Sequence, residues 1–152
     1  MKRIALNNPG PHDCCNYKIC KDISDTLYIV FAGLDCYAGD VPSPAEEAIL
    51  TTAIPPAQKA WHWDSNLSPS PCAITFISVD IICINGSLDV NFEIVMQDAS
   101  ASDEYSRSWH GSVPLENLNG PINTTLILSS NDTSAVPTCG CSFPDITLSI
   151  ME

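Results

Sequence analysis

The sequence predicts an all-β protein, an antiparallel β-sandwich of jelly-roll type with at most one short helix and a cysteine cluster joining the termini. Three observations predict it. Short segments in which apolar and polar residues alternate recur along the chain, separated by turns rich in Pro, Gly, Asn and Ser. The residues around Asn85-Gly86 have the pattern of a hairpin. Six of the eight cysteines lie within the first 36 residues or the last 14.

The strongest strand signal is a hairpin over residues 73–96. Apolar residues occupy every second position on both sides of Asn85-Gly86, the preferred two-residue type I′ turn. One face of this hairpin is apolar and the other polar, as a half-solvated antiparallel sheet requires. The predicted pairs are Cys83 with Leu88, Ile81 with Val90, Val79 with Phe92, Ile77 with Ile94, Ser78 with Glu93 and Asp80 with Asn91.

Five further strands are expected, at residues 26–32, 61–63, 107–113, 124–129 and 146–150. One short helix is expected over residues 43–50. There Ser43-Pro44-Ala45-Glu46 has the form of a capping box with proline at the first helical position. This helix would close one end of the sandwich.

The sequence also repeats the pattern C-x5-T-L-x-I, from Cys20 to Ile29 and from Cys141 to Ile150. If both copies are strands of one fold, their entry ends can lie side by side. That arrangement would gather the N-terminal and C-terminal cysteines and tie the termini together. Chance agreement is the alternative, because the sequence has no third copy.

The cysteines have three interpretations. Disulfides between the N-terminal cluster and the C-terminal pair are preferred over free thiols and over a zinc site built from the same residues, with His12 in reserve. The spacing is atypical for zinc, because the two-residue gap of a zinc knuckle is missing; apart from this alternative no cofactor is expected. The cluster consists of Cys14, Cys15, Cys20, Cys139 and Cys141.

The two central cysteines should not be bonded to each other. A continuous strand between Cys72 and Cys83 would hold them about 36 Å apart, far beyond the span of a disulfide. Cys83, on the apolar face of the hairpin, is interpreted as a small buried apolar residue.

The composition and charge of the chain limit the classes of protein to which it can belong. The chain has 152 residues, enough for one domain with its own core, and 45% of them are hydrophobic, which opposes disorder. The longest apolar stretch is interrupted by Asp80, so no membrane span is expected. With 18 acidic and 6 basic residues the net charge is −12, which argues against a nucleic-acid partner.

Four of the six basic residues lie in the first 21 residues, where Asp13 is the only acid; they are Lys2, Arg3, Lys18 and Lys21. We therefore divide the chain into a basic N-terminal arm, residues 1–21, and a single β-sandwich domain, residues 22–152. The arm either docks on the acidic body of a neighbouring copy, as an assembly device, or folds back onto its own domain.

The start of the chain has no apolar run of the length of a secretory signal, so export by that route is not expected. Four triplets of the glycosylation type are interpreted as chance, because the modification requires passage through a secretory lumen. They begin at Asn66, Asn85, Asn123 and Asn131.

No catalytic motif is present, and we do not expect an enzyme. The histidines His12, His62 and His110 are scattered, and the chain has no nucleophile elbow, zinc-protease motif or phosphate-binding glycine loop. Alternation in Trp61-His62-Trp63 places the two indoles on one face, where core packing is the ordinary outcome. The alternative is an exposed glycan platform formed by Trp61, Trp63 and Trp109.

These motifs together resemble small cysteine-rich β proteins encoded in bacterial and phage genomes. The stretch from Ser24 to Gly33 fits the first-strand pattern "P/S-D-T-L-x-V-x-F-x-G" of those proteins, and the ending Cys139-Gly140-Cys141 followed by Pro144-Asp145 is similar to their closing strand. The resemblance covers both ends and is weaker in the middle. It implies a virion or surface β module and carries over no catalytic residue.

We therefore expect a non-enzymatic structural protein of a phage-like virion, made in the host cytoplasm. The first expectation is a capsid decoration or cement protein on the outer surface, and otherwise a tail or neck component. Its partners would be the major capsid or tail protein and further copies of itself. A carbohydrate-binding or adhesive module that uses the tryptophans is the alternative, and a zinc-stabilised intracellular interaction domain is a third.

Overall fold

The computed structural model describes residues 18–34, 42–54, 58–68, 70–100, 102–134 and 136–152. These residues form short 3-10 helices and β-strands, in the order η1 (Cys20–Asp22), β1 (Thr26–Ala32), β2 (Glu46–Ile54), β3 (Gln58–Asn66), β4 (Ile74–Ile84), β5 (Ser87–Gln97), β6 (Glu104–Pro114), η3 (Leu115–Asn117), β7 (Asn123–Ser130) and β8 (Ile146–Met151).

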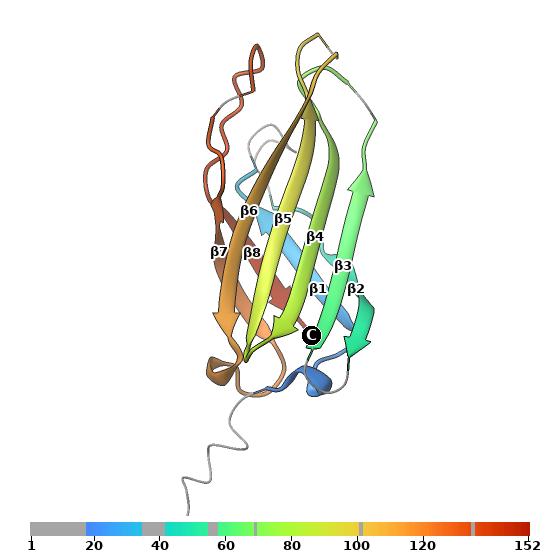
Figure 1. The fold of residues 1–152 in the computed structure, drawn as a ribbon, viewed down its shortest axis with the longest axis vertical. Coiled ribbons are helices and arrows are strands. Elements are labelled where there is room, and N and C mark those ends of the chain that lie inside the picture. Colours follow the sequence, from blue (N-terminus) through green and yellow to red (C-terminus); the bar gives the residue numbers. More distant parts are fainter. Residues whose placement is uncertain (1–17, 35–41, 55–57, 69, 101, 135) are drawn as a thin grey trace, which may run out of the picture.

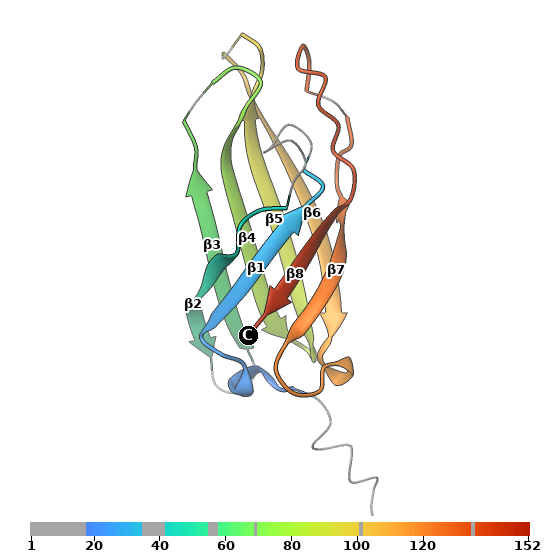
Figure 2. The same ribbon diagram turned by 180° about the vertical axis from the view of Figure 1, so that it is seen from behind.

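The strands form one closed antiparallel barrel, so the prediction of a sandwich is wrong although the all-β class is right. Each strand pairs with the next along the chain, and β8 closes the barrel by pairing with β1. The strands β3 to β6 form one long wall (Figure 1), and β7, β8 and β1 form the wall behind it (Figure 2). The strand β2 links the two walls at one side.

The barrel has two walls like a sandwich, but both corners between them are hydrogen-bonded. At one corner β6 and β7 share only two residue pairs, Trp109 with Ser130 and His110 with Ser129. At the other corner β2 has an irregularity in register between Leu50 and Thr52, which lets one strand pair with both walls. Inward and outward alternation is the same in a sandwich and in a barrel, so the pattern alone does not distinguish them.

The central hairpin is confirmed in its register. β4 and β5 pair Cys83 with Leu88, Ile77 with Ile94 and the predicted residues between them. Asn85 and Gly86 both have positive φ, 53° and 78°, as a type I′ turn requires. The strands predicted around residues 26, 61, 107, 124 and 146 are also present.

The helix predicted over residues 43–50 is wrong, because this region enters β2. Ser43 does not cap a helix: its hydroxyl oxygen accepts a hydrogen bond from the Phe31 amide at 3.0 Å, and its own amide donates to the Phe31 carbonyl. Within β2, Ala48 is buried while Glu47 and Ile49 are exposed, which is strand alternation. Pairing with two neighbouring strands outweighs the local capping signal.

The inward side chains of both walls form one hydrophobic core. An aromatic series crosses it, with ring centroids 5.8 Å apart between Trp63 and Phe31, 5.0 Å between Phe31 and Phe92, and 5.6 Å between Phe92 and Trp109. The rings of Phe92 and Trp109 meet edge to face, the preferred arrangement for aromatic pairs. The barrel interior is therefore occupied by its own side chains.

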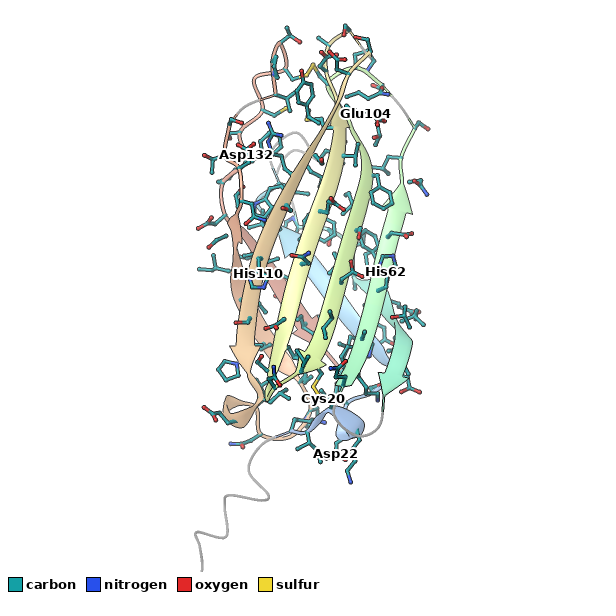
Figure 3. The ribbon with its side chains drawn as sticks, in the orientation of Figure 1. Cys20, Asp22, His62, Glu104, His110 and Asp132 are labelled. Atoms are coloured by element: carbon teal, nitrogen blue, oxygen red, sulfur yellow. A yellow bond between two sulfur atoms is a disulfide. The ribbon has the colours of Figure 1, made fainter. Side chains whose placement is uncertain are left out.

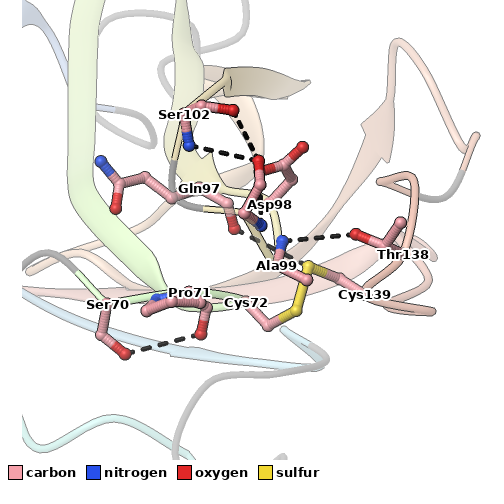
Figure 4. The surroundings of a disulfide bond; sticks show 10 residues. Ser70, Pro71, Cys72, Gln97, Asp98, Ala99, Ser102, Thr138 and Cys139 are labelled. Atoms are coloured by element: carbon pink, nitrogen blue, oxygen red, sulfur yellow. Dashed lines mark hydrogen bonds between the residues drawn. A yellow bond between two sulfur atoms is a disulfide. The ribbon is translucent and has the colours of Figure 1, made fainter.

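Disulfides close opposite ends of the barrel, and the described pairs differ from the predicted ones. Cys20 in η1 is bonded to Cys83 at the end of β4, so Cys83 is not the free apolar residue we expected. Cys139 is bonded to Cys72, just before β4 (Figure 4). Cys72 and Cys83 are not bonded to each other, which confirms the distance argument.

The repeated C-x5-T-L-x-I segments become neighbouring strands, but not in the expected way. β1 and β8 pair from Tyr28 with Met151 to Ala32 with Thr147. Because they run antiparallel, their entry ends lie at opposite ends of the barrel (Figure 2). Cys20 therefore lies at the other end from Cys139, and the prediction that these cysteines share one rim is wrong.

Candidate functional site

The predicted glycan platform is not available on the surface. Trp61 and Trp109 are fully buried, and each indole N–H donates to a loop carbonyl, of Ser24 and Pro144 respectively. Trp63 is partly buried against the core. The indole rings pack in the core, which was the ordinary expectation. A candidate site is therefore sought among other residues, on the outer surface.

The outside of β3 to β6 is acidic, and we call it the acidic wall. Among the described residues of these strands no lysine or arginine faces outward, because Lys59 and Arg107 lie buried, with 9% and 8% of their surfaces exposed. Glu104 marks the end of this wall near the loops (Figure 3). The outward acidic side chains are Asp64, Asp80, Asp89, Glu93 and Glu104.

The two buried cations hold the ends of the barrel together. The Lys59 ammonium donates to the carbonyl of Ile23 and lies 3.1 Å from the Asp25 carboxylate, which ties β3 to the entry of β1. The Arg107 guanidinium donates to the Ser134 carbonyl at 3.0 and 3.2 Å and lies over the Phe143 ring. Both positive charges are therefore used inside the molecule.

One row of polar side chains crosses the acidic wall from strand to strand. The register pairs His62 with Asp80, Asp80 with Asn91, and Asn91 with His110. Figure 3 shows the two histidines at the same level on β3 and β6. Alternation around Trp61-His62-Trp63 signals that His62 faces outward, but the register of β3 against β4 has no local signal.

The His62 ring is held between two carboxylates. Its Nδ1 lies 2.7 Å from Asp80 Oδ1 and its Nε2 lies 2.8 Å from Asp64 Oδ2. The hydrogen bonds to Asp64 and Asp80 raise the pKa of His62 above its ordinary value of 6.5, and burial only partly opposes them. The ring therefore joins β3 to β4 through Asp80, and both hydrogen bonds favour its protonated form.

A depression of about 440 Å³ lies beside this row. Its apolar part contains Ile82, 40% of whose surface is exposed, and Ala60. Carboxylates, an amide and an imidazole stand around these apolar groups. Such a surface suits a cation with an aliphatic stem. The lining residues are Ala60, Trp61, Asp80, Ile82, Asp89, Asn91 and His110.

The opposite wall has no charge on its outside, and we call it the uncharged wall. On β1, β7 and β8 every outward side chain of the described residues is apolar, hydroxyl-bearing or an amide. Ile127 is 65% exposed and Tyr28 is 41% exposed. The outward residues are Thr26, Tyr28, Val30, Ala32, Asn123, Thr125, Ile127, Ser129, Thr147, Ser149 and Met151.

The predicted basic arm lies only in part within the described residues. Lys18 is bound to the barrel: its ammonium lies 2.8 Å from Glu152, whose carboxylate also accepts hydrogen bonds from the amides of Ser24 and Ile122. Burial works to raise the pKa of the Glu152 carboxyl, but these bonds outweigh it and hold that pKa below its ordinary value. Lys21 is exposed on η1. Lys2, Arg3, His12, Cys14 and Cys15 lie outside the described residues.

The alternative of a zinc site finds no ligand set within the described ranges. Cys20 and Cys139 are disulfide-bonded to other residues, and Cys141 is also in a disulfide. Nowhere in the described part of the chain do three histidine, cysteine or acidic side chains converge in a metal-binding arrangement. No helix in the same ranges is long and apolar enough to span a membrane.

Comparison with known proteins adds no assignment: no family model, curated protein or solved structure matches the chain.

Proposed function

We propose that the protein is a non-enzymatic structural module on the outer surface of a phage-like particle, which it joins by binding a shell protein. The division of its surface into an acidic wall and an uncharged wall carries this proposal. A filled interior leaves the walls as the surfaces on which the molecule acts. The uncharged wall can be covered by a partner without the cost of removing a charge from water.

The acidic wall supports an outward-facing position. Its carboxylates repel the phosphates of packaged nucleic acid, whereas they suit the solvent side of a particle. Disulfides at both ends of the barrel support the same position, because such bonds persist in oxidising surroundings outside the cell.

The histidine row supports a structural rather than a catalytic role. Both ring nitrogens of His62 are bonded to carboxylates on a solvent-exposed strand surface, which suits a cross-strand bridge. A general base instead needs a free nitrogen directed at a nucleophile or substrate. The carbohydrate-binding alternative rested on exposed tryptophans and loses that basis, since Trp61 and Trp109 are buried.

The test is to ask where the protein is found on particles released from cells that produce it. We expect it to sediment with the major shell protein in a fixed ratio. On intact particles whose nucleic acid stays protected from nuclease, it should react with a carboxylate label. Recovery in the soluble fraction, labelling only after the particles are opened, or turnover of a substrate would overturn the proposal.

A pair of variants tests which wall is attached. Ile127→Asp places a charge at the most exposed large apolar side chain of the uncharged wall and should abolish attachment. Ser106→Asp adds the same charge to an exposed position of the acidic wall and should leave attachment unchanged. Near-ultraviolet circular dichroism of the buried tryptophans checks that both variants are folded. Equal attachment of the two variants would contradict the role of the uncharged wall.

A further inference from the structure

We propose that the Cys72–Cys139 disulfide is a thiol-exchange site, which a small thiol such as glutathione opens while Cys20–Cys83 stays closed. The bond fastens the tip of the loop between β7 and β8 to the open end of the β4–β5 hairpin (Figure 4). Opening it therefore releases this tip from the barrel. The order in which the two bonds open does not depend on the particle role proposed above; only the place where the exchange occurs rests on that role.

The two bonds differ in how far a thiol can reach their sulfur atoms. Cys20 and Cys83 are 6% and 0% exposed and belong to the hydrophobic core. Cys72 and Cys139 are half-buried, and Cys139 packs against the same core from its edge. Exchange needs a thiolate in contact with a disulfide sulfur, so its rate depends on access. A thiol in solution therefore reaches Cys72–Cys139 on the folded protein, whereas Cys20–Cys83 becomes accessible when the barrel opens.

Loop closure does not separate the two bonds. Cys20–Cys83 has a sequence separation of 63 residues and Cys72–Cys139 has one of 67. In the chain-entropy model the stabilisation depends on the logarithm of the loop length, so the two bonds restrict the unfolded chain almost equally. A difference between their equilibria with a thiol must therefore come from the folded protein.

The backbone beside this bond is in a conformation that its residues disfavour. Among the described non-glycine residues φ is positive at Cys72 (58°), at Thr138 (65°) and at Asn85, which belongs to the hairpin turn. Left-handed backbone is an outlier for a β-branched residue such as threonine, and it persists where the surrounding structure enforces it. Neither cysteine of the other bond is in this region. Opening the strained bond lets Cys72 and Thr138 relax, which favours its reduction.

The bond holds the tip of its loop rather than the whole loop. Val136 before the tip and Phe143 after it are buried, so both sides of the loop are anchored in the barrel. Between them residues 137, 138 and 140 are exposed. Besides the disulfide, the Ala99 amide donates a hydrogen bond to Thr138 Oγ1 at 3.3 Å. Opening the bond therefore frees the tip while the strands stay paired.

The exchange proceeds in two displacement steps with a thiol as the reductant. The thiolate of one glutathione attacks a sulfur of the bond, forms a mixed disulfide and displaces the other cysteine as a thiolate, which takes up a proton. A second glutathione thiolate attacks the glutathione sulfur of the mixed disulfide and displaces the remaining cysteine in the same way. Two electrons thus pass from two glutathione molecules, which leave as glutathione disulfide, to the two cysteine thiols.

The proposed particle role supplies the change of surroundings. A protein made in the cytoplasm meets a reducing glutathione pool, whereas a particle outside the cell meets oxidising surroundings. The tip is therefore free while the protein is made and assembled, and it is fastened after the particle is released.

The first test measures which bond opens first. The oxidised full chain is equilibrated with graded mixtures of reduced and oxidised glutathione at fixed total concentration. Its thiols are then blocked with N-ethylmaleimide and located by peptide mass spectrometry. We expect Cys72 and Cys139 to be half-labelled at a reduced-to-oxidised ratio at least tenfold below that for Cys20 and Cys83. Near-ultraviolet circular dichroism of the buried tryptophans should be unchanged at that point.

Simultaneous opening of the two bonds, or earlier opening of Cys20–Cys83, would overturn the proposal. So would loss of the tryptophan signal together with the first bond, because that result means that exchange requires unfolding of the barrel.

The second test asks whether the bond holds the tip. Amide hydrogen exchange of residues 138–140 should be at least tenfold faster in Cys72→Ser/Cys139→Ser than in the unmodified chain, with exchange in β4, β5 and β6 unchanged. The matched control Thr138→Ala removes the hydrogen bond from Ala99 but keeps the disulfide, and should change exchange in the tip less than threefold. Unchanged exchange in the double variant, or an equal gain in the control, would overturn the role of the bond. Neither measurement involves particles, so the thiol-exchange site and the particle role fail separately.

Discussion

Gly111 lies where β7 approaches β6 closely enough to leave little room for a side chain. A Cβ atom at this position of β6 would lie 2.6 Å from Leu128 Cδ2 and 3.0 Å from the Ile127 carbonyl oxygen on β7. The two strands share only two residue pairs, so β7 crosses β6 where a side chain is missing. Glycine inside a strand often marks such a close approach of backbones.

We therefore expect Gly111→Ala to lower the free energy of unfolding by about 1–3 kcal/mol, as overpacking does in a well-filled core. Urea denaturation measures it, with Ser112→Ala on the exposed side of β6 as the control. In a Leu128→Ala background the cost should be smaller, because the contacted methyl group is gone. Equal costs in the two backgrounds would show that the crossing is not the cause.

The raised pKa of His62 predicts that the protein loses stability as the pH rises on the alkaline side. Its pKa is raised in the folded protein by its hydrogen bonds to Asp64 and Asp80, so its contribution to stability is fully present below the unfolded value of 6.5. That contribution is lost as the pH rises through the higher folded pKa. Because the pair is partly exposed, its size should not exceed about 1 kcal/mol.

The measurement compares unfolding free energies of the unmodified chain and His62→Gln between about pH 5.5 and about pH 8.5. The difference between them should be largest at the acidic end and shrink toward the alkaline end. His110→Gln removes the other histidine of the row, for which the described residues show no carboxylate clamp, and serves as the control. A difference that grows with pH would contradict the bridge.

Among the elements, β2 illustrates how tertiary pairing outweighs a local signal. The capping-box pattern at Ser43 is genuine in the sequence, yet Ser43 bonds to β1, and β2 pairs with both β1 and β3. A short helix would leave the edges of β1 and β3 unpaired, at the cost of several backbone hydrogen bonds. The strand is therefore selected by its neighbours.

The disulfides join the two ends of β4 to segments that are distant in the sequence. Cys72 and Cys139 join the segment before β4 to the loop before β8, where the Cys72 amide also donates to Gln97 and the Ala99 amide to Thr138 (Figure 4). The bond closes a sequence separation of 67 residues, and Cys20–Cys83 closes one of 63.

Replacing both Cys72 and Cys139 by alanine should lower the free energy of unfolding by about 4 kcal/mol, mainly through the entropy of the unfolded chain. Chemical denaturation of Cys72→Ala/Cys139→Ala against the unmodified chain measures this loss. Reduction of the unmodified chain should cost at least as much, because it also opens Cys20–Cys83. An unchanged free energy of unfolding in the double variant would show that the Cys72–Cys139 bond does not stabilise the protein.

For the whole molecule, the distribution of charge is the dominant feature. The net charge is −12, the acidic wall has no outward lysine or arginine among its described residues, and Lys59 and Arg107 are buried. Repulsion between carboxylates therefore opposes the folded state and is screened by salt over about 10 Å at 0.1 M.

We expect the Tm to rise by several degrees between about 0.02 M and about 0.5 M sodium chloride. Glu93→Gln, which removes one carboxylate near the middle of the acidic wall, should raise the Tm at low salt and reduce the gain from added salt. Thr125→Ala on the uncharged wall is the control and should leave the salt dependence unchanged. A Tm that falls as salt is added would show that attractive pairs dominate instead.

The candidate site could be predicted only in its local parts. Asp80 opposite Asn91 follows from the hairpin, and the alternation around His62 places that residue on the outside. The pairing of β3 with β4 brings His62 to Asp80, and the pairing of β5 with β6 brings His110 to Asn91. Neither register has a tight turn with a recognisable sequence to set it, so the row and its depression were not predictable.

The sequence by itself determined the strands other than β2 and the register of the central hairpin, because alternation and an Asn-Gly turn act between residues close in the chain. Only the tertiary structure decided that the sheet closes and that Cys20 pairs with Cys83 rather than with the C-terminal cysteines. Both depend on which distant surfaces meet: closure brings β7 close to β6 at Gly111, and the antiparallel course of β1 and β8 separates Cys20 from the C-terminal cysteines. The alternation of apolar and polar residues is the same in a sandwich and in a closed barrel, so it does not tell the two folds apart.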